Sequence, residues 1–430
     1  MSADTYCVIG AGVAGLATAR RFVARGIACE VFEAADGIGG LWDARRPDSP
    51  VSRNTHLIAS KQVQAFPDFP MPEDYPAYPG HELVLRYLHA YAERFDLLRY
   101  IRLNSPVSRV EPAAGGSAAG WTVEFGDGSR RDFAGVVVAT GHDRHPRRID
   151  LPGDPTAPVL HSCEYRDPSQ VLGKRVLVIG AGQSAADILA DCAVNAARTV
   201  HSSRRGFYCM PKYLLGRPTD TLLQGRMWRP LRRRAFLGLF SYLRRRSRAF
   251  GLPVPDFTEG VVIPMLGDQL HHHYTHGDIA AKPDIVEIHG DTVEFADGST
   301  ETVDLILLAT GFVPDYPVVD REHLNWVDGE LRPRLYLNIF PPHTPNLFVV
   351  GMVRPIGSHW DLYERQAELV ADYLIAKSDP IRVRRFETAI RGPQPNLYAG
   401  LRLYHADHYP LVVEKQDYLY QLRKHAKLLK

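Results

Sequence analysis

The chain has 430 residues, 45% of them apolar and 23% charged, and a formal net charge of +2. This length predicts about two or three domains with sizeable cores, and the ordinary composition excludes disordered, collagen-like and coiled-coil classes. A nearly neutral chain gives no reason to expect a nucleic acid as partner.

The five cysteines are scattered and never spaced as Cys-x-x-Cys, which indicates reduced thiols and a cytoplasmic location. Residues 7–9 run directly into a glycine turn and predict a strand, not a signal sequence. The longest apolar runs, 305–313 and 347–353, are less than half the roughly 20 residues of a membrane helix. We therefore expect no transmembrane anchor.

A strand, a turn and a helix open the chain. Residues 5–10 are β-branched and apolar, and residues 13–25 carry Ala and Leu at helical spacing. A second strand at 27–33 completes a βαβ unit with a parallel, right-handed crossover.

The turn of this unit is Gly10-x-Gly12-x-x-Gly15. Its glycines permit close approach of a pyrophosphate to the positive end of the helix. Glu33 ends the second strand, where a carboxylate accepts hydrogen bonds from an adenosine ribose. The pattern predicts a site for FAD or NAD.

A further run of glycines, Gly-Ile-Gly-Gly-Leu-Trp, occupies residues 37–42. Successive glycines let the backbone pass close to a flat or phosphorylated ligand. We expect Gly40, Leu41 and Trp42 to contact the cofactor, and a structural role is the alternative for Trp42.

The βαβ pattern returns about 170 residues later, with strands at 174–180 and 198–203. The second turn is Gly180-x-Gly182-x-x-Ala185, and we expect it to hold a second dinucleotide. At the start of the helix, Gln183 and Ser184 face the expected pyrophosphate; an ordinary helix-start Ser is the alternative for Ser184.

The two units differ where the ribose would lie. Ser203 stands in the position of Glu33, and Arg204 and Arg205 follow it. A carboxylate repels a ribose 2′-phosphate, whereas a guanidinium binds it in bidentate fashion. The first site is therefore predicted to hold FAD and the second NADPH.

A second duplication follows the first. Val-Glu-Phe-Gly-Asp-Gly-Ser at 123–129 leads to Ala-Thr-Gly at 139–141, and Val-Glu-Phe-Ala-Asp-Gly-Ser at 293–299 leads to Ala-Thr-Gly at 309–311. Each Asp-Gly marks a hairpin turn, and each apolar run after it a buried strand. The expected cofactor contacts here are Thr140, Gly141, Thr310 and Gly311.

Together these repeats predict an α/β fold with two Rossmann-like dinucleotide-binding domains, for FAD and NADPH, each with a β-meander. The FAD domain is expected to be discontinuous, at 1–165 and 301–430, with C-terminal helices. The NADPH domain is expected at 168–300, with an Arg-rich helical insertion at about 215–280.

Two further segments have no part in these units. Residues 226–248 hold nine arginines among apolar residues, which predicts a solvated covering helix or, alternatively, a membrane-surface or partner-docking helix. His271, His272, His273 and His276 form a cluster without a matching carboxylate or Cys pattern, so we expect no metal site.

The order of the motifs resembles that of the flavin-containing monooxygenase family over nearly the full chain. The matching pieces are GxGxxG, Gly-Gly-Leu-Trp, Phe-Pro-Asp-Phe-Pro at 66–70, the first Ala-Thr-Gly, His-Ser-x-x-Tyr-Arg at 161–166, GxGxxA and the second Ala-Thr-Gly.

Two stretches depart from the family. Its identifying motif, Phe-x-Gly-x-x-x-His-x-x-x-Tyr or Phe, is here Pro155-x-Ala157-x-x-x-His161-x-x-x-Tyr165; the final Tyr favours this family over Baeyer-Villiger enzymes, which have Trp there. We expect His161 to bond a cofactor or the backbone. Many members also have Thr-Asn-x-Pro-Lys where residues 57–61 are Leu-Ile-Ala-Ser-Lys.

No catalytic residue can be assigned by this resemblance, because Ile58 replaces the Asn near the reactive flavin edge. Asn54, Ser60 and Lys61 are the candidates. By analogy with the family, the strand at 347–351 and a helix starting at Ser358 bring Gly351 and Gln366 to the flavin, where the helix start stabilises the reduced ring.

The resemblance implies an enzyme in which NADPH reduces FAD, O2 adds to give a C4a-hydroperoxyflavin, and a nucleophilic N or S atom of a small metabolite is oxygenated. The alternatives are Baeyer-Villiger or decarboxylative oxygenation of a ketone or 2-oxo acid and, outside enzymes, a nucleotide-binding redox sensor. The absence of a redox cysteine pair disfavours a disulfide reductase. A homodimer is left open.

Overall fold

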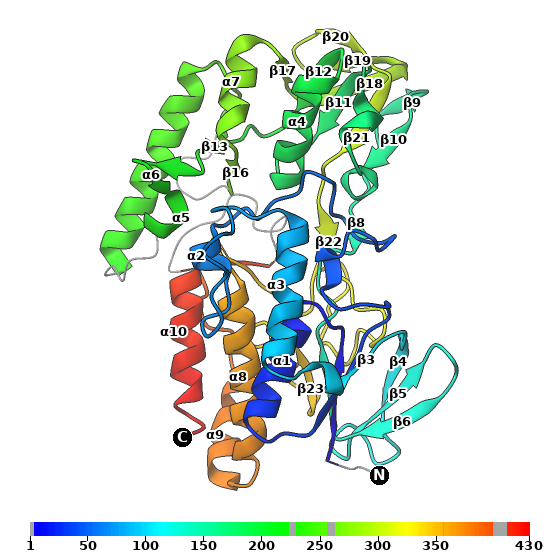
Figure 1. Cartoon of the computed structure of the whole chain (residues 1–430), viewed down its shortest axis with the longest axis vertical. Helices are drawn as coiled ribbons and strands as arrows, with labels where there is room; N and C mark the ends of the chain where they lie inside the picture. Colours follow the sequence, from blue (N-terminus) through cyan, green and yellow to red (C-terminus); the bar gives the residue numbers. More distant parts are fainter. Residues whose placement is uncertain (1–3, 223–228, 256–262, 356, 399–410) are drawn as a thin grey trace.

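The structure is a computed structural model that describes residues 4–222, 229–255, 263–355, 357–398 and 411–430. Two five-stranded parallel sheets dominate it, and each has its own buried core. Figure 1 shows one sheet in the lower half and the other in the upper half of the molecule.

The first sheet has the order β23-β7-β1-β2-β3, and all its neighbours are parallel. Helices α1 and α8 pack against each other beside it. The chain thus returns to its first sheet near its end, as predicted for a discontinuous domain. The elements are β1 (Tyr6–Ile9), α1 (Val13–Ala24), β2 (Cys29–Phe32), β3 (Ile101–Arg102), β7 (Gly135–Val138), β23 (Leu347–Val349) and α8 (Trp360–Ala376).

The second sheet has the order β10-β21-β11-β12-β17 and is also parallel. Helix α4 packs against its central strands. The elements are β10 (Val159–His161), β11 (Arg175–Ile179), α4 (Gln183–Asn195), β12 (Arg198–Ser202), β17 (Ile279–Lys282) and β21 (Leu305–Leu308).

The second sheet includes strands from beyond two of the expected domain boundaries. β10 belongs to the second sheet although it precedes the boundary at 165, and β21 belongs to it although it follows the boundary at 300. The reason is parallel pairing: β21 lies between β10 and β11, which brings its Ala-Thr-Gly end beside the second glycine turn.

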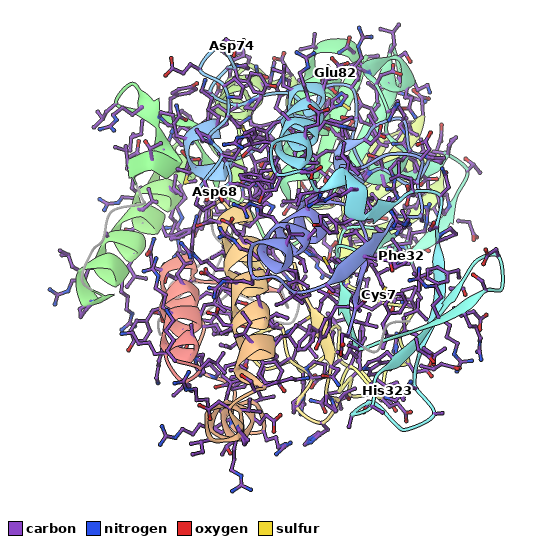
Figure 2. The ribbon with its side chains drawn as sticks, turned by 60° about the horizontal axis from the view of Figure 1, so that its bottom comes forward. Cys7, Phe32, Asp68, Asp74, Glu82 and His323 are labelled. Carbon is purple, nitrogen blue, oxygen red and sulfur yellow. The ribbon has the colours of Figure 1, made fainter. Side chains whose placement is uncertain are left out.

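The two units repeat each other in register. Ile9 pairs with Phe32, and the Gly10 amide donates to the Phe32 carbonyl over 2.8 Å. Ile179 pairs with Ser202, and the Gly180 amide donates to the Ser202 carbonyl over 3.1 Å. Figure 2 labels Phe32, the last residue of β2. Glu33 follows it directly, so its carboxylate lies at the end of this strand.

Both predicted meanders are present as antiparallel sheets. The first is formed by β4 (Val107–Pro112), β5 (Trp121–Phe125) and β6 (Arg130–Phe133), and the second by β18 (Ile285–Gly290), β19 (Thr292–Phe295) and β20 (Thr300–Thr302). In each Asp-Gly turn the Asp carboxylate accepts a hydrogen bond from the following Ser amide, over 2.9 Å at Asp127 and 3.0 Å at Asp297.

The Arg-rich stretch forms a helix, α6 (Arg229–Ala249), in its described part; residues 226–228 lie outside the described residues. Phe240 and Leu243 are its buried anchors, and Phe240 contacts the Tyr208 ring at 5.9 Å between centroids. The stretch is therefore helical and packs one side against the protein, and its role stays a prediction. In the described part of the chain, no helix combines the length and apolarity needed to cross a bilayer.

The remaining elements connect these parts or cover them. They are α2 (Lys61–Gln64), α3 (His81–Arg94), β8 (His145–Pro146), β9 (Gly153–Pro155), β13 (Cys209–Met210), β14 (Tyr213–Leu214), β15 (Arg217–Pro218), α5 (Thr219–Leu222), β16 (Met265–Leu266), α7 (Asp268–His276), β22 (Phe312–Val313), β24 (Arg354–Pro355), α9 (Pro380–Ile390), β25 (Val412–Val413) and α10 (Lys415–Ala426).

The first glycine turn is packed without room for side chains. A Cβ at Gly15 would lie 1.8 Å from the Gly10 carbonyl oxygen, and one at Gly10, whose φ is +103°, would lie 2.7 Å from the Ala139 carbonyl oxygen. A Cβ at Gly182 in the second unit would meet no heavy atom within 4 Å. The second turn is equally tight at Gly180, whose φ is +120° and where a Cβ would lie 2.3 Å from the Ala309 carbonyl oxygen, so in this turn only Gly182 is open.

The contrast between Gly15 and Gly182 predicts the outcome of two substitutions. Gly15→Ala forces α1 away from β1 and should lower the free energy of unfolding by about 3 kcal/mol. Gly182→Ala, at the open position of the second turn, should change it by less than about 1 kcal/mol. Thermal and chemical unfolding of the two variants measure this; similar losses would contradict it.

Candidate active site

A cavity of about 600 Å³ lies between the two sheets. Its walls include both glycine turns, both Ala-Thr-Gly segments and the loop after β23. Helices α2 and α5 pack against each other at this junction (Figure 1). The volume is in the range of ligand sites in proteins, and the cavity joins two sites of the same kind.

The structure places most of the expected binding residues in this cavity. Those that line it are Gly10, Gly12, Glu33, Gly40, Leu41, Trp42, Thr140, Gly141, Gly182, Gln183, Ser184, Gly311 and Gly351. Those outside the lining are Gly15, Gly180, Ser203, Arg204, Arg205, Thr310 and Gln366.

Glu33 is a buried carboxylate with three donors. It accepts hydrogen bonds from the amides of Ala11 over 2.8 Å and Ala35 over 3.0 Å, and from the guanidinium of Arg46 over 2.9 Å. A carboxylate has about four acceptor sites, so one remains for a further donor in the cavity. That arrangement fits a ribose hydroxyl and leaves no place for a phosphate.

The second strand end is built differently. Ser203 is buried, and its amide donates to the Lys282 carbonyl over 3.2 Å, which holds the β12 end against β17. Arg204, which follows it, is exposed and Arg205 half-buried. Gln183 uses its side chain inside the protein, because its amide group bonds both the backbone N–H and the carbonyl of Leu266.

Two of the expected cofactor contacts, Gln366 and Thr310, form hydrogen bonds within the protein and do not line the cavity. Gln366 is fully buried behind Gly351: its Oε1 accepts the Gly351 amide over 2.9 Å, and its Nε2 donates to the Tyr418 hydroxyl. The hydroxyl of Thr310 donates to the Arg147 carbonyl. Helix α8 begins after His359, its N-cap residue, and not at Ser358. Gln366 therefore positions Gly351 from the far side.

The three catalytic candidates are structural. The amide and hydroxyl of Ser60 donate to the two carboxylate oxygens of Asp220, over 2.6 and 2.9 Å. Lys61 Nζ donates to backbone carbonyls, including that of Glu73 over 2.6 Å. Asn54 donates to Asp191 over 2.9 Å. None of the three lines the cavity, since each is committed to a partner elsewhere in the chain.

Residue 58, where many members of the family have Asn, does line the cavity. Ile58 is 39% exposed there and offers an apolar surface. Near it on the chain, Gln64 also lines the cavity; it is buried, and its Oε1 has no hydrogen-bond partner among the described residues. Two other lining residues, Trp360 and Ser162, also have a buried polar atom, Nε1 and Oγ, without a partner in the described part of the chain.

These unpaired polar atoms belong to residues of the cavity wall but are themselves covered by protein. A buried donor or acceptor without a partner costs about 1–3 kcal/mol. Trp42 lines the cavity beside them and contacts Trp360 edge-to-face at 6.4 Å between ring centroids. A flat aromatic cofactor with polar edges suits this wall.

His161 forms a hydrogen bond with the backbone, which is one of the two partners expected for it, the other being a cofactor. It is fully buried, and its Nε2 lies 3.0 Å from the Gly311 carbonyl oxygen, to which it donates as the Nε2–H tautomer. Burial lowers the pKa of His161, which keeps the ring neutral. The residue thereby ties the end of β10 to the second Ala-Thr-Gly.

The comparisons with known proteins agree with this site. The model of the flavin-binding monooxygenase-like family matches residues 3–378. The chain belongs to this family.

Its relatives support the same conclusion. Dimethylaniline monooxygenase (N-oxide-forming) 2 of Mus musculus is 32% identical over 85% of this chain and 72% of its own length. Among solved structures, S-allyl-L-cysteine S-oxygenase from Allium sativum is 23% identical over 98% of this chain and 88% of its own, with a TM-score of 0.68. A steroid monooxygenase bound to NADP is 19% identical over 98% and 97%, with a TM-score of 0.68.

This flavin-binding monooxygenase is an NADPH-dependent oxidoreductase that uses FAD and NADPH. The two Rossmann-like units provide a place for two dinucleotides, and the cavity that they share brings the two places together. The redox-sensor alternative is therefore set aside.

One cavity carboxylate has a strongly shifted pKa. Burial raises the pKa of Asp187 to about 6, and a hydrogen bond from Gln183 partly opposes the shift. Lys212 and His56 nearby also lower the pKa of Asp187, whereas the negative charge of the Asp191 carboxylate raises it. Asp187 lies on α4, one turn after the second glycine turn.

The shift makes the stability of the enzyme pH-dependent. The folded-state pKa of Asp187 lies above its unfolded value, so the folded protein loses stability as pH rises from about 4 to about 6. Asp187→Asn should have the same melting temperature as the parent near pH 4. At pH 8 it should be the more stable of the two, by about 3 kcal/mol, because the pKa shift is about two units. Differential scanning fluorimetry across this range measures the gap, and a gap independent of pH would contradict the assignment.

Proposed function

We propose that the first glycine turn holds FAD and the second holds NADPH, with the nicotinamide directed along the cavity toward the flavin. The observation that carries this is the single cavity lined by both glycine turns. Glu33 would accept the ribose of FAD, and the turn at Gly10 and Gly12 would face its pyrophosphate. Arg204 and Arg205 would bind the 2′-phosphate of NADPH.

The reaction we propose is oxygenation of a nucleophilic N or S atom of a small metabolite. The bound cofactors supply the reducing equivalents and the ring that activates O2. The names of two similar proteins specify N-oxide formation and S-oxygenation, which supports this substrate class. The apolar wall at Ile58 favours a substrate that is neutral near the reacting atom.

The residues around the cavity hold the two units in contact. Asp220 of α5 receives both donors of Ser60 at the start of α2. Tyr78 donates to the Lys212 carbonyl over 2.7 Å, and the Lys212 ammonium lies 5.0 Å from the Tyr78 ring centroid. These contacts cross between chain segments far apart in sequence, and a closed junction protects a reactive oxygen species from hydrolysis.

A second candidate reaction is Baeyer-Villiger or decarboxylative oxygenation of a ketone or 2-oxo acid. The observation that favours it is the replacement of the family's Asn by Ile58, which lines the cavity. Without that amide, the wall near the flavin offers fewer groups to a polar nucleophile.

One panel of substrates separates the two reactions. The purified FAD-loaded enzyme should consume NADPH and O2 and convert an amine or thioether to its oxide, with little H2O2. A ketone oxidised to an ester in preference to both would support the second candidate. Stoichiometric H2O2 with every substrate would overturn both.

The second glycine unit generates its own prediction. Arg204→Ala with Arg205→Ala should raise the KM for NADPH about 100-fold, because charge-assisted hydrogen bonds to a phosphate are lost, and leave the KM for NADH nearly unchanged. The matched control is Arg198→Ala at the start of β12, the strand that precedes the two arginines; the Arg198 guanidinium pairs with Glu301 over 2.7 Å. Equal loss with both nucleotides would place the 2′-phosphate elsewhere.

Two coarser features complete the proposal. A cytoplasmic location is supported by the cysteines, which are all free, four of them buried. A homodimer stays a prediction, and light scattering after size-exclusion chromatography measures it.

A further inference from the structure

Helix α7 carries a cluster of histidines at its C-terminal end, remote from the cavity. The sequence offered these imidazoles no carboxylate. The structure supplies one: α7 ends at Gly277, whose φ of +81° turns the chain back, and Asp278 then faces the helix it has just left. The left-handed C-cap makes this reversal possible.

The ligand atoms lie close together. His273 Nδ1 is 2.9 Å from Asp278 Oδ2, and one ligand atom each of His272, His273 and Asp278 falls within 4.8 Å of the others. The rings of His276 and His272 lie 3.9 Å apart between centroids and are tilted by 32°, as expected for residues one helical turn apart. His276 Nδ1 lies 2.9 Å from the His272 carbonyl oxygen, which leaves its Nε2 as a free acceptor.

The electrostatics agree with the geometry. The hydrogen bond from His273 lowers the pKa of Asp278, and the charges of His273, His276 and His272 lower it further. Asp278 is exposed at this helix end, and its carboxylate contacts His273 directly. His271, by contrast, is buried and contacts the Phe250 ring at 5.2 Å, so it points into the protein.

We propose that His272, His273 and Asp278, with His276 beside them, bind a divalent transition-metal ion of the Zn²⁺ type. Imidazole nitrogens with one carboxylate suit Zn²⁺, Ni²⁺ or Cu²⁺, whereas Mg²⁺ and Ca²⁺ require oxygen ligands. Zn–N bonds are about 2.0–2.1 Å, so the ligands must approach further, and these largely exposed side chains can rotate without disturbing the core.

The ion would join the end of α7 to the turn that leads into β17. β17 pairs with β12, and β12 ends immediately before Ser203. None of the four residues lines the cavity, so the ion would stabilise this edge of the second sheet without taking part in the reaction.

The test uses tag-free, FAD-loaded enzyme freed of metal with a chelator. Titration with ZnCl2 at pH 7.5, followed by isothermal calorimetry, should show one tight site per chain with micromolar affinity, and Zn²⁺ should raise the melting temperature. Mg²⁺ should do neither. Binding should be lost at pH 5.5, because protonated imidazoles are not ligands.

Variants locate the ion. His272→Gln and Asp278→Asn should each weaken Zn²⁺ binding about tenfold or more and abolish the thermal shift, with NADPH oxidation unchanged. The matched control is His289→Gln, an exposed histidine 3.5 Å from Glu287 on β18, which should bind Zn²⁺ as the parent does. Parent-like affinity in both cluster variants, or no site tighter than millimolar in the parent, would overturn the proposal.

Discussion

A backbone contact too close for any side chain fixes the first nucleotide site. The first helical turn of α1 lies against the Gly10 carbonyl at Gly15, and Gly10 itself lies against the end of β7 at Ala139. Helix start and strand ends are thereby held in one position, which directs the helix N-terminus at the cavity. Glu33, the Ala-Thr-Gly end and Gly351 all take their places relative to that point.

Duplication then allows the same frame to bind two different nucleotides. The paired registers at Ile9 with Phe32 and Ile179 with Ser202 place Glu33 and Ser203 at equivalent points. At the first point, three donors already hold the carboxylate in place, so a ribose adds to an existing network. At the second, the absence of a carboxylate removes the repulsion that would exclude a 2′-phosphate. Under the proposed assignment, this one difference at a strand end would separate the roles of the two units.

Local patterns predicted what depends on local geometry. Strand, glycine turn and helix are neighbours in sequence, and so are the Asp-Gly turns of the meanders; all were found where expected. The failures concern partners distant in the chain. Ser60 bonds Asp220, which is 160 positions away, and Asn54 bonds Asp191, which is 137 positions away. A periodic sequence pattern does not predict such pairs. The carboxylate of Asp278 was overlooked for another reason, since its approach to His273 depends on the backbone turn at Gly277.

The same long-range contacts explain why the cavity wall differs from that of the family. The segment carrying Ile58 is fixed on both sides, by Asn54 to Asp191 and by Ser60 to Asp220, so its backbone does not depend on what side chain occupies position 58. An amide there can be exchanged for an apolar group without moving the loop. Gln64, a few residues further on, also lines the cavity, so this wall combines an apolar and a polar side chain. Under the proposed function, the exchange at position 58 would favour a substrate that presents an apolar surface to this wall.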